Sequence, residues 1–200
     1  MLRAPAAAGE WLPLPARRRY EARRSSVVGV LSLHEPTRDE FGVRQTWLAD
    51  PGMMSYNAGW DITYPGYDRV SGCIDWPESD WTAFEARLAL PAARQGYYYV
   101  LDTESGQFIG HVHYLVESNG TAEIGFNVIP SRRSQGLGAP FLRLLLNRVW
   151  ADTAAEVIVQ EFEDERVAAV KVHQKCGFTP ERKTSTSHGR PTRTRRLARA

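Results

Sequence analysis

The chain has 200 residues, of which 42% are hydrophobic, and its formal net charge is +2. This length suits one domain with a normal core. No apolar run approaches the roughly 18 residues of a membrane helix, and the start lacks the continuous apolar segment of a secretory signal. The only cysteines are Cys73 and Cys176, which favours a reducing compartment, and we predict a cytoplasmic protein.

The charge is distributed unevenly along the chain. Residues 1–26 hold six arginines against two glutamates, and residues 180–200 hold seven basic residues against one glutamate. Both segments are too polar to bury a core, so we predict disordered basic extensions on either side of one domain at 27–179. No base-reading motif accompanies the arginines, so a nucleic-acid partner is not predicted. The acidic remainder suits a cationic ligand.

The first half of the chain predicts one strand, two helices and a long loop. Thr37 and Glu40 form a capping-box pattern at the start of the first helix. The segment from Met53 to Trp76 is aromatic, irregular and rich in glycine, and a long loop of this kind in a compact domain is often functional. The alternative is a surface loop packed by its own aromatic rings. The predicted elements are strand 27–34, helix 38–48 and helix 77–90.

Three strands of a meander follow, joined by tight turns at 103–106 and 118–120. They are predicted at 96–101, 108–117 and 123–129. In the last strand, Ile124, Phe126 and Val128 alternate with polar or small residues, so the two sets lie on opposite faces. Pro130 ends the strand because it cannot donate a ladder hydrogen bond.

A turn with two glycines then leads into a leucine-rich helix. Gly136 and Gly138 precede apolar residues at helical spacing, among them Phe141, Leu145 and Val149. The first amides of a helix are unpaired and carry partial positive charge, and glycine lets an anion approach the backbone. The turn therefore suits a phosphate, although a bare G-x-G also fits a tight connection without a ligand. A strand at 156–162 and a helix from Asp164 or Glu165 to about Lys175 complete the pattern.

The stretch Arg133-Ser-Gln-Gly136-Leu-Gly138 fits the pattern Q/R-x-x-G-x-G/A after a strand ending in V-x-P. It resembles the acetyl-CoA signature of the GNAT superfamily of N-acetyltransferases, and the resemblance extends over residues 27–178. It implies an α+β fold with a central, mostly antiparallel, twisted sheet flanked by helices. Beyond Pro180 the sequence departs from the family, and the prediction is that the family's final hairpin is either missing here or replaced by an aberrant end.

The resemblance also implies a binding site for acetyl-CoA as co-substrate. The pantetheine arm would pair with Val128, and Asp164 would lie near it unless it merely caps a helix. Ser134 stands where family members often have glycine, a difference expected to cost little. The pyrophosphate would be held by the residues of the turn, namely Arg133, Ser134, Gln135, Gly136, Leu137 and Gly138.

Catalytic residues are carried over in the same way. Glu123 resembles a frequent position of the general base, and its alternative is a solvent-facing carboxylate. His111 and His113 share one face of a strand, so they could relay a proton or bind the acceptor, with His113 as the catalytic candidate. The alternative is a pair of ordinary polar residues on the strand face, and no third residue completes a metal site. His173 occupies the position of the tyrosine that serves as general acid in many relatives. Cys73 is a weaker candidate for an acyl-carrying nucleophile.

In GNAT-like folds the segment after the first helix helps to form the acceptor wall, which implies that Asn57, Trp60, Asp61 and Tyr64 bind the substrate. The predicted function is therefore acetyl transfer from acetyl-CoA to a primary amine, preferably a small cationic one, by direct transfer in a ternary complex. The alternative is a degenerate acyl-CoA-binding protein without turnover. The sequence leaves the oligomeric state open, a homodimer included.

Overall fold

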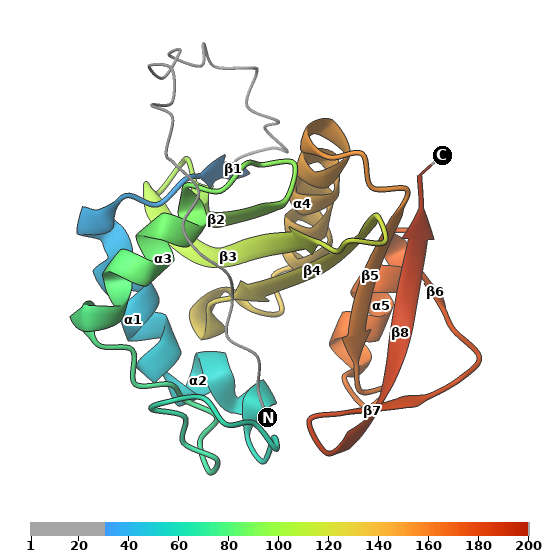
Figure 1. The fold of residues 1–200 in the computed structure, drawn as a ribbon, viewed down its shortest axis with the longest axis horizontal. Coiled ribbons are helices and arrows are strands. Elements are labelled where there is room, and N and C mark those ends of the chain that lie inside the picture. The colour runs from blue at the N-terminus through green and yellow to red at the C-terminus, as the bar shows by residue number, and fades with distance from the viewer. Residues whose placement is uncertain (1–30, 200) are drawn as a thin grey trace, which may run out of the picture.

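The computed structural model describes residues 31–199, which build one eight-stranded sheet with helices on both faces (Figure 1). The strand order is β1-β2-β3-β4-β5-β8-β6, and β7 pairs with β8. The strands are β1 (Leu31–His34), β2 (Gln95–Asp102), β3 (Gln107–Val116), β4 (Thr121–Val128), β5 (Val157–Phe162), β6 (Thr179–Pro180), β7 (Ser185–Ser187) and β8 (Arg190–Ala198). The α-helices are α1 (Phe41–Ala49), α2 (Pro51–Met54), α3 (Trp81–Leu88), α4 (Gly138–Asp152) and α5 (Val167–Lys175).

The sheet opens between its two central strands. All neighbouring strands are antiparallel except β4 and β5, which are parallel. Their pairing begins at Thr121 with Val157 and ends at Glu123 with Val159. Beyond Glu123 the two strands diverge, as Figure 1 shows. The rest of β4 is therefore paired with β3 alone, as the Val128 and Gly110 pair illustrates.

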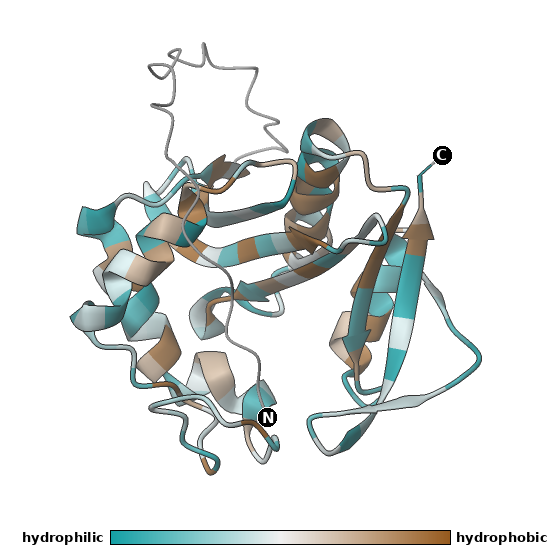
Figure 2. Cartoon of the chain, viewed as in Figure 1, coloured by the Kyte–Doolittle hydropathy of each residue, from teal (hydrophilic) through white to brown (hydrophobic). Residues whose placement is uncertain are grey.

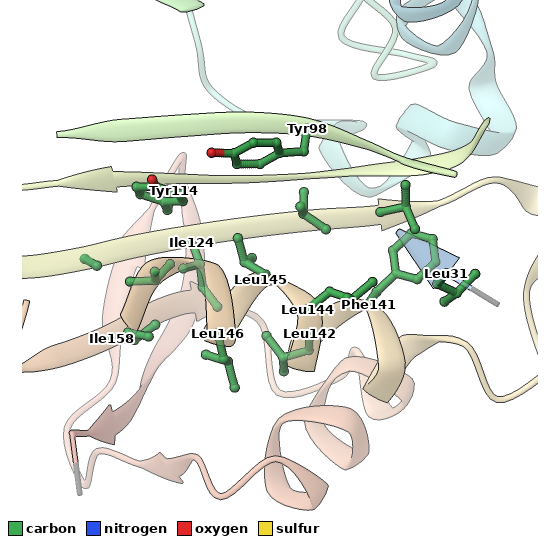
Figure 3. Packing of buried hydrophobic residues seen from close by; sticks show 14 of the residues in the cluster. Leu31, Tyr98, Tyr114, Ile124, Phe141, Leu142, Leu144, Leu145, Leu146 and Ile158 are labelled. Atoms are coloured by element: carbon green, nitrogen blue, oxygen red, sulfur yellow. The ribbon is translucent and has the colours of Figure 1, made fainter. Parts of the chain in front are cut away.

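One face of the sheet is covered by α4. Phe141, Leu142 and Leu145 are fully buried and belong to the same cluster as Tyr114 and Ile124, and Figure 3 shows Phe141 and Leu145 on the side of the helix that faces the strands. A buried leucine of this kind stabilises the fold by about 2–5 kcal/mol relative to alanine. The helical spacing of the apolar residues thus produces the predicted contact face.

The other face carries a second, aromatic core formed by α1, α3 and the loop between them. Phe41, Trp76 and Phe84 pack there against Tyr99 of β2. The capping box exists as predicted, because Glu40 Oε2 accepts a 2.8 Å hydrogen bond from the Thr37 amide. The predicted loop begins with α2 and a 3₁₀ turn, and the rest is mainly irregular.

The predicted helices and strands are confirmed to within a few residues. The first strand is seen only from Leu31 onward, so its predicted part at 27–30 and the extension at 1–26 lie outside the described residues. In the described part of the chain, no helix is both long enough and apolar enough to cross a membrane.

The prediction of a disordered tail at 180–200 and a missing hairpin is wrong for the residues up to 199. The strand β8 pairs with the whole of β5, from Val157 with Ala198 to Phe162 with Arg193, and its first three residues pair with β7. Figure 2 shows how hydrophilic most of β8 is. The strand is held by Arg195, which is 3% exposed and lies with its guanidinium 3.8 Å from the centre of the Phe162 ring. A long arginine stem and a flat cation can cover an apolar surface, so a low content of aliphatic residues did not prevent folding.

Candidate active site

Two cavities meet where β4 and β5 diverge. The first, here called the turn cavity, has a volume of about 660 Å³ and lies between the end of β4, the glycine turn and α5. The second, the sheet cavity, has a volume of about 830 Å³ and lies over β2, β3 and β4. The residues that line both, and so mark the junction, are Tyr56, Phe126, Gln160, Phe162 and Arg166.

The turn leaves backbone amides free for a ligand. No side chain caps α4, which starts at Gly138, so its first N–H groups have no partner from a capping residue. Gly136 has φ +79°, which favours glycine. A Cβ at Gly138 would lie 2.8 Å from Val172 Cγ2, so this glycine permits α4 and α5 to pack closely.

Ser134 also lies in the left-handed region, with φ +61°. This conformation costs an L-residue about 1–2 kcal/mol relative to its usual region. The prediction that serine costs little at this position therefore needs correction. The backbone gives the physical reason for glycine at this place in the pattern.

Most of the predicted cofactor residues line the turn cavity, and two do not. Val128, Arg133, Ser134, Gly136, Leu137 and Gly138 line it. The Gln135 side chain donates to the Ser131 carbonyl instead. Asp164 lines neither cavity, because it forms ion pairs with Arg193 at 2.7 Å and Arg195 at 2.5 Å.

Arg133 has a structural role beside its place in the turn cavity. Its guanidinium donates to the carbonyl of Val128 at 3.0 Å and to the carbonyl of Gly52 at 2.7 Å, which ties β4 to α2. Partial burial lowers the pKa of its guanidinium group. The ordinary pKa of arginine is so high that the group still stays charged at neutral pH.

The turn cavity is electropositive. Among its lining residues there is no aspartate or glutamate. Two cationic residues come from α5, one directly precedes α5, and two come from the turn. This set suits a polyphosphate, because guanidinium and ammonium groups bind phosphate oxygens. The cationic lining residues are Arg132, Arg133, Arg166, Lys171 and Lys175.

Glu123 faces the sheet cavity from β4, at the point where β4 and β5 separate. Partial burial raises the pKa of its carboxyl group, and the nearby carboxylates of Glu117 and Glu161 add to the effect. A carboxylate with a raised pKa is a better proton acceptor at neutral pH than an ordinary one. Glu123 therefore has the position and the electrostatics of a base, while its role stays a prediction.

His111 and His113 face the same cavity, as predicted from their spacing. Their ring centres are 6.0 Å apart, and His113 stacks on Tyr97 at 6.2 Å. The His113 ring lies over Gly125, where a Cβ would collide with it. Its ring is open to the cavity, yet enclosure by the surrounding side chains and the charges of two arginines lower its pKa. His113 is therefore neutral at pH 7, and its lowered pKa makes it a weaker proton acceptor than an ordinary histidine.

His173 is 1% exposed and lines the turn cavity. Its Nδ1 lies 2.8 Å from the Ala169 carbonyl oxygen, and its Nε2 lies 2.7 Å from Oε1 of Gln160. Burial lowers its pKa to about 4, so the ring is neutral and carries one N–H. One of the two contacts then requires Gln160 to turn its amide NH₂ toward the ring. Both ring nitrogens are thus occupied within the protein.

Two of the four predicted acceptor residues line the sheet cavity. Asn57 and Trp60 do, whereas Asp61 and Tyr64 lie outside it and are exposed. Asn57 Oδ1 is buried without a hydrogen bond in the described part of the chain. The same holds for Oε2 of Glu163, whose other oxygen lies 3.5 Å from Trp60 Nε1. Glu163 Oε2 still forms a 3.8 Å ion pair with Arg166, so Asn57 Oδ1 is the acceptor that suits a ligand with a hydrogen-bond donor.

The residues of the junction were not predicted from the sequence. Gln160, Phe162 and Arg166 come from β5 and the start of α5, and only the divergence of two strands brings them to Tyr56. The one available signal was the aromatic loop that contains Tyr56. No local pattern marks the others.

A sheet that opens between parallel strands, ahead of a glycine turn and an uncapped helix, with an electropositive cavity at the turn, defines an acyl-CoA-dependent acyltransferase. The sequence model of the acetyltransferase (GNAT) domain matches residues 30–179, and the chain belongs to this family. It is an N-acetyltransferase that uses acetyl-CoA as co-substrate. The resemblance seen in the sequence and the α+β fold are confirmed.

Solved structures share the fold at low sequence identity. The spermidine N-acetyltransferase of Vibrio cholerae in complex with CoA and spermine has a TM-score of 0.65 and 13% identity, with 84% of this chain and 95% of that one covered. A putative acetyltransferase from Salmonella typhimurium with acetyl-CoA has a TM-score of 0.60 and 15% identity over 85% and 94%. An aminoglycoside acetyltransferase with coenzyme A has a TM-score of 0.62 and 17% identity over 84% and 95%.

Proposed function

We propose that the protein transfers the acetyl group of acetyl-CoA to a primary amine bound in the sheet cavity, by direct transfer in a ternary complex. The observation that carries this proposal is the junction of a cavity without carboxylates and a second cavity that contains them. All the charged side chains that line the turn cavity are cationic, whereas the sheet cavity contains the carboxylates of Glu123, Glu161 and Glu163 as well as arginines. The spermidine and aminoglycoside enzymes also act on amines, which supports the proposal by analogy.

In this proposal the co-substrate lies along the turn cavity. The free amides of the turn and of the start of α4 hold the pyrophosphate, and the cationic side chains neutralise it. Beyond Glu123 the edge of β4 has no neighbouring strand and is open to the pantetheine arm as far as Val128, whose carbonyl accepts from Arg133. Such a placement brings the thioester to the junction, where it meets an amine from the sheet cavity.

The amine must lose a proton before it attacks the thioester carbonyl. The carboxylates of the sheet cavity attract the ammonium group. Glu123 accepts the proton, directly or through His113, and the free amine then forms the new C–N bond while the C–S bond breaks. The rate should rise with pH through the raised pKa of Glu123, and Glu123→Gln should lower kcat about 100-fold or more. A pH profile that is the same in Glu123→Gln would contradict this role.

The leaving thiolate needs a proton donor at the junction. His173 is the donor predicted from the sequence, but its single N–H is held by its partners within the protein. Tyr56 lines both cavities, and burial raises the pKa of its hydroxyl, so it is protonated at neutral pH. We therefore add Tyr56 as the better-placed acid. Tyr56→Phe should lower kcat and leave acetyl-CoA affinity unchanged, whereas a loss confined to His173→Gln would favour the histidine.

Calorimetric titration of acetyl-CoA into the full chain tests the site. Gly136→Glu should abolish binding, because a carboxylate would enter the anion site. Gly120→Glu is a matched control in the β3–β4 turn, since Gly120 has the same φ of +79° and a Cβ there, as at Gly136, would meet no atom within 4 Å. Equal loss of affinity in both variants would refute the assignment of the turn.

Release of CoA with a panel of amines tests turnover. Binding with amine-dependent release supports the proposed transferase. Binding without release for any amine would favour the alternative, an acyl-CoA-binding protein without turnover. The cytoplasmic location and the oligomeric state stay predictions.

A further inference from the structure

Arg44 of α1 lines the sheet cavity from the side opposite to β5. Its guanidinium carbon lies 5.2 Å from the ring centre of Trp76, 4.8 Å from that of Phe84 and 5.0 Å from that of Tyr97. One of its terminal nitrogens donates a 2.9 Å hydrogen bond to the Tyr97 hydroxyl. Three rings and one hydroxyl therefore hold the cation in place at the cavity wall.

The charge of Arg44 has no counter-ion among the residues that the structure describes. Among residues 31–199, no aspartate or glutamate forms an ion pair with it. Its Nε is buried without a hydrogen bond, and so is Nδ1 of His111, which lines the same cavity. Cation–π contacts offset part of the lost hydration, yet buried charges are normally paired as well. Only one nitrogen of the Arg44 guanidinium has a hydrogen bond within residues 31–199, so the remaining N–H groups of this cavity-lining side chain can donate to an anionic ligand.

The surroundings of Arg44 strengthen this polarity. Arg87 of α3 lines the same end of the cavity and forms no ion pair in the described part of the chain, while Glu85 is already paired with Arg38 at 2.9 Å. The charges of Arg44 and Arg87 together help to keep His113 neutral. The cavity carboxylates lie at the other end, on β4, on β5 and just after β5, as Glu123, Glu161 and Glu163.

The register of the sheet sets the separation between the two ends. Tyr97, whose hydroxyl accepts the hydrogen bond from Arg44, pairs with His113, and His113 pairs with Gly125. Gly125 is two residues from Glu123 and lies on the same face of β4. Neighbouring strands are about 4.8 Å apart, so the two ends lie about 10 Å from one another. A volume of about 830 Å³ is in the range of small-molecule sites.

We propose that the acceptor carries a carboxylate at the end remote from the reacting amine, and that Arg44, assisted by Arg87, binds this carboxylate. The planar guanidinium matches a carboxylate better than a point charge does. This inference rests on the proposed acetyl transfer and changes the expected small cationic amine into an ω-amino acid. The amine lies at the carboxylates of β4 and β5, and the acid group lies over Tyr97.

A pair of product-like ligands tests the site without turnover. Calorimetry on the full chain saturated with CoA compares 6-acetamidohexanoate with N-hexylacetamide, which lacks only the carboxylate. The wild type should bind the carboxylate ligand at least about tenfold more tightly, as expected for a hydrogen bond between charged groups. Arg44→Met should remove this preference, and Arg44→Lys should keep part of it. Arg38→Met, a nearby arginine whose charge is already paired with Glu85, should leave the preference unchanged.

Equal affinities of the wild type for the two ligands, or no binding of 6-acetamidohexanoate, would overturn the inference. So would a preference that survives in Arg44→Met while the melting temperature falls, since Arg44 would then only support the aromatic core. Release of CoA with 6-aminohexanoate and with hexylamine separates the two proposals. If neither amine causes release of CoA but ligand binding depends on Arg44, the result would contradict the proposed acetyl transfer and support the proposed carboxylate site. Equal turnover of both amines would support the proposed acetyl transfer and contradict the proposed carboxylate site.

Discussion

Acidification should destabilise the fold through His173. Burial lowers the pKa of this side chain from 6.5 to about 4, so the unfolded chain binds a proton more readily than the folded one. The group's contribution to stability is therefore complete above pH 6.5 and is lost as the pH falls toward 4. From these two pKa values the loss is about 2 kcal/mol at pH 5 and about 3 kcal/mol at pH 4.

The structure explains why the proton is excluded. His173 is 1% exposed and lies against the rings of Phe126, Phe162 and Phe178, at 5.9, 4.8 and 4.9 Å between centres. These rings offer no carboxylate to stabilise a second N–H. An imidazolium here would also be repelled by Arg195.

Equilibrium unfolding in urea at pH 7.5 and pH 5 measures the effect in the wild type and in His173→Gln. Other titrating groups act in both proteins and cancel in the comparison. The fall in unfolding free energy between the two pH values should be about 2 kcal/mol smaller in the variant. An equal fall would refute the argument. If the variant does not fold, NMR titration of the ring in the wild type decides the question, since a pKa above 6 would show a hydrated or paired histidine.

Three further substitutions have defined outcomes. Ser134→Gly should raise the unfolding free energy by about 0.5–1 kcal/mol, because relief at φ +61° exceeds the added freedom of the unfolded chain; a loss of stability in thermal unfolding would contradict this. Gly125→Ala should displace the His113 ring and lower kcat about tenfold or more, with unchanged acetyl-CoA affinity; full activity would exclude a role for that ring. Arg195→Ala should lower stability by about 2–4 kcal/mol, as it removes a buried contact with Phe162 and an ion pair; a loss below about 0.5 kcal/mol in urea unfolding would show that backbone pairing alone holds β8.

The sequence predicted the parts of the molecule that local patterns encode. The spacing of Phe141 and Leu145 identified the contact face of α4, and Thr37 with Glu40 marked the start of the first helix. The turn at Gly136 was found because its function depends on consecutive backbone positions. In each case the chemistry is contained in a short run of neighbouring residues, and tertiary structure adds no new partner.

The residues that line the sheet cavity could not be predicted from local sequence patterns, because they come together only after folding. Arg44 and Arg87 come from two helices on one side, while Gln160 and Glu163 come from the far side of the opened sheet. Sequence spacing relates none of them to Glu123. For the same reason Asp164 was placed near the cofactor, although the folded chain pairs it with arginines of β8.

The C-terminal strand shows why composition misjudged the last part of the chain. The edge of β5 needs a neighbour to satisfy its backbone groups, and β8 supplies it whatever its side chains are. Alternation along the strand then buries Arg195 and exposes Arg196. An arginine-rich segment is expected to be disordered only when its guanidinium groups have no aromatic rings or carboxylates to contact in the folded protein. Here Phe162 is the last residue of β5 and Asp164 follows it closely, so the backbone pairing of β8 with β5 also brings Arg195 to both side chains.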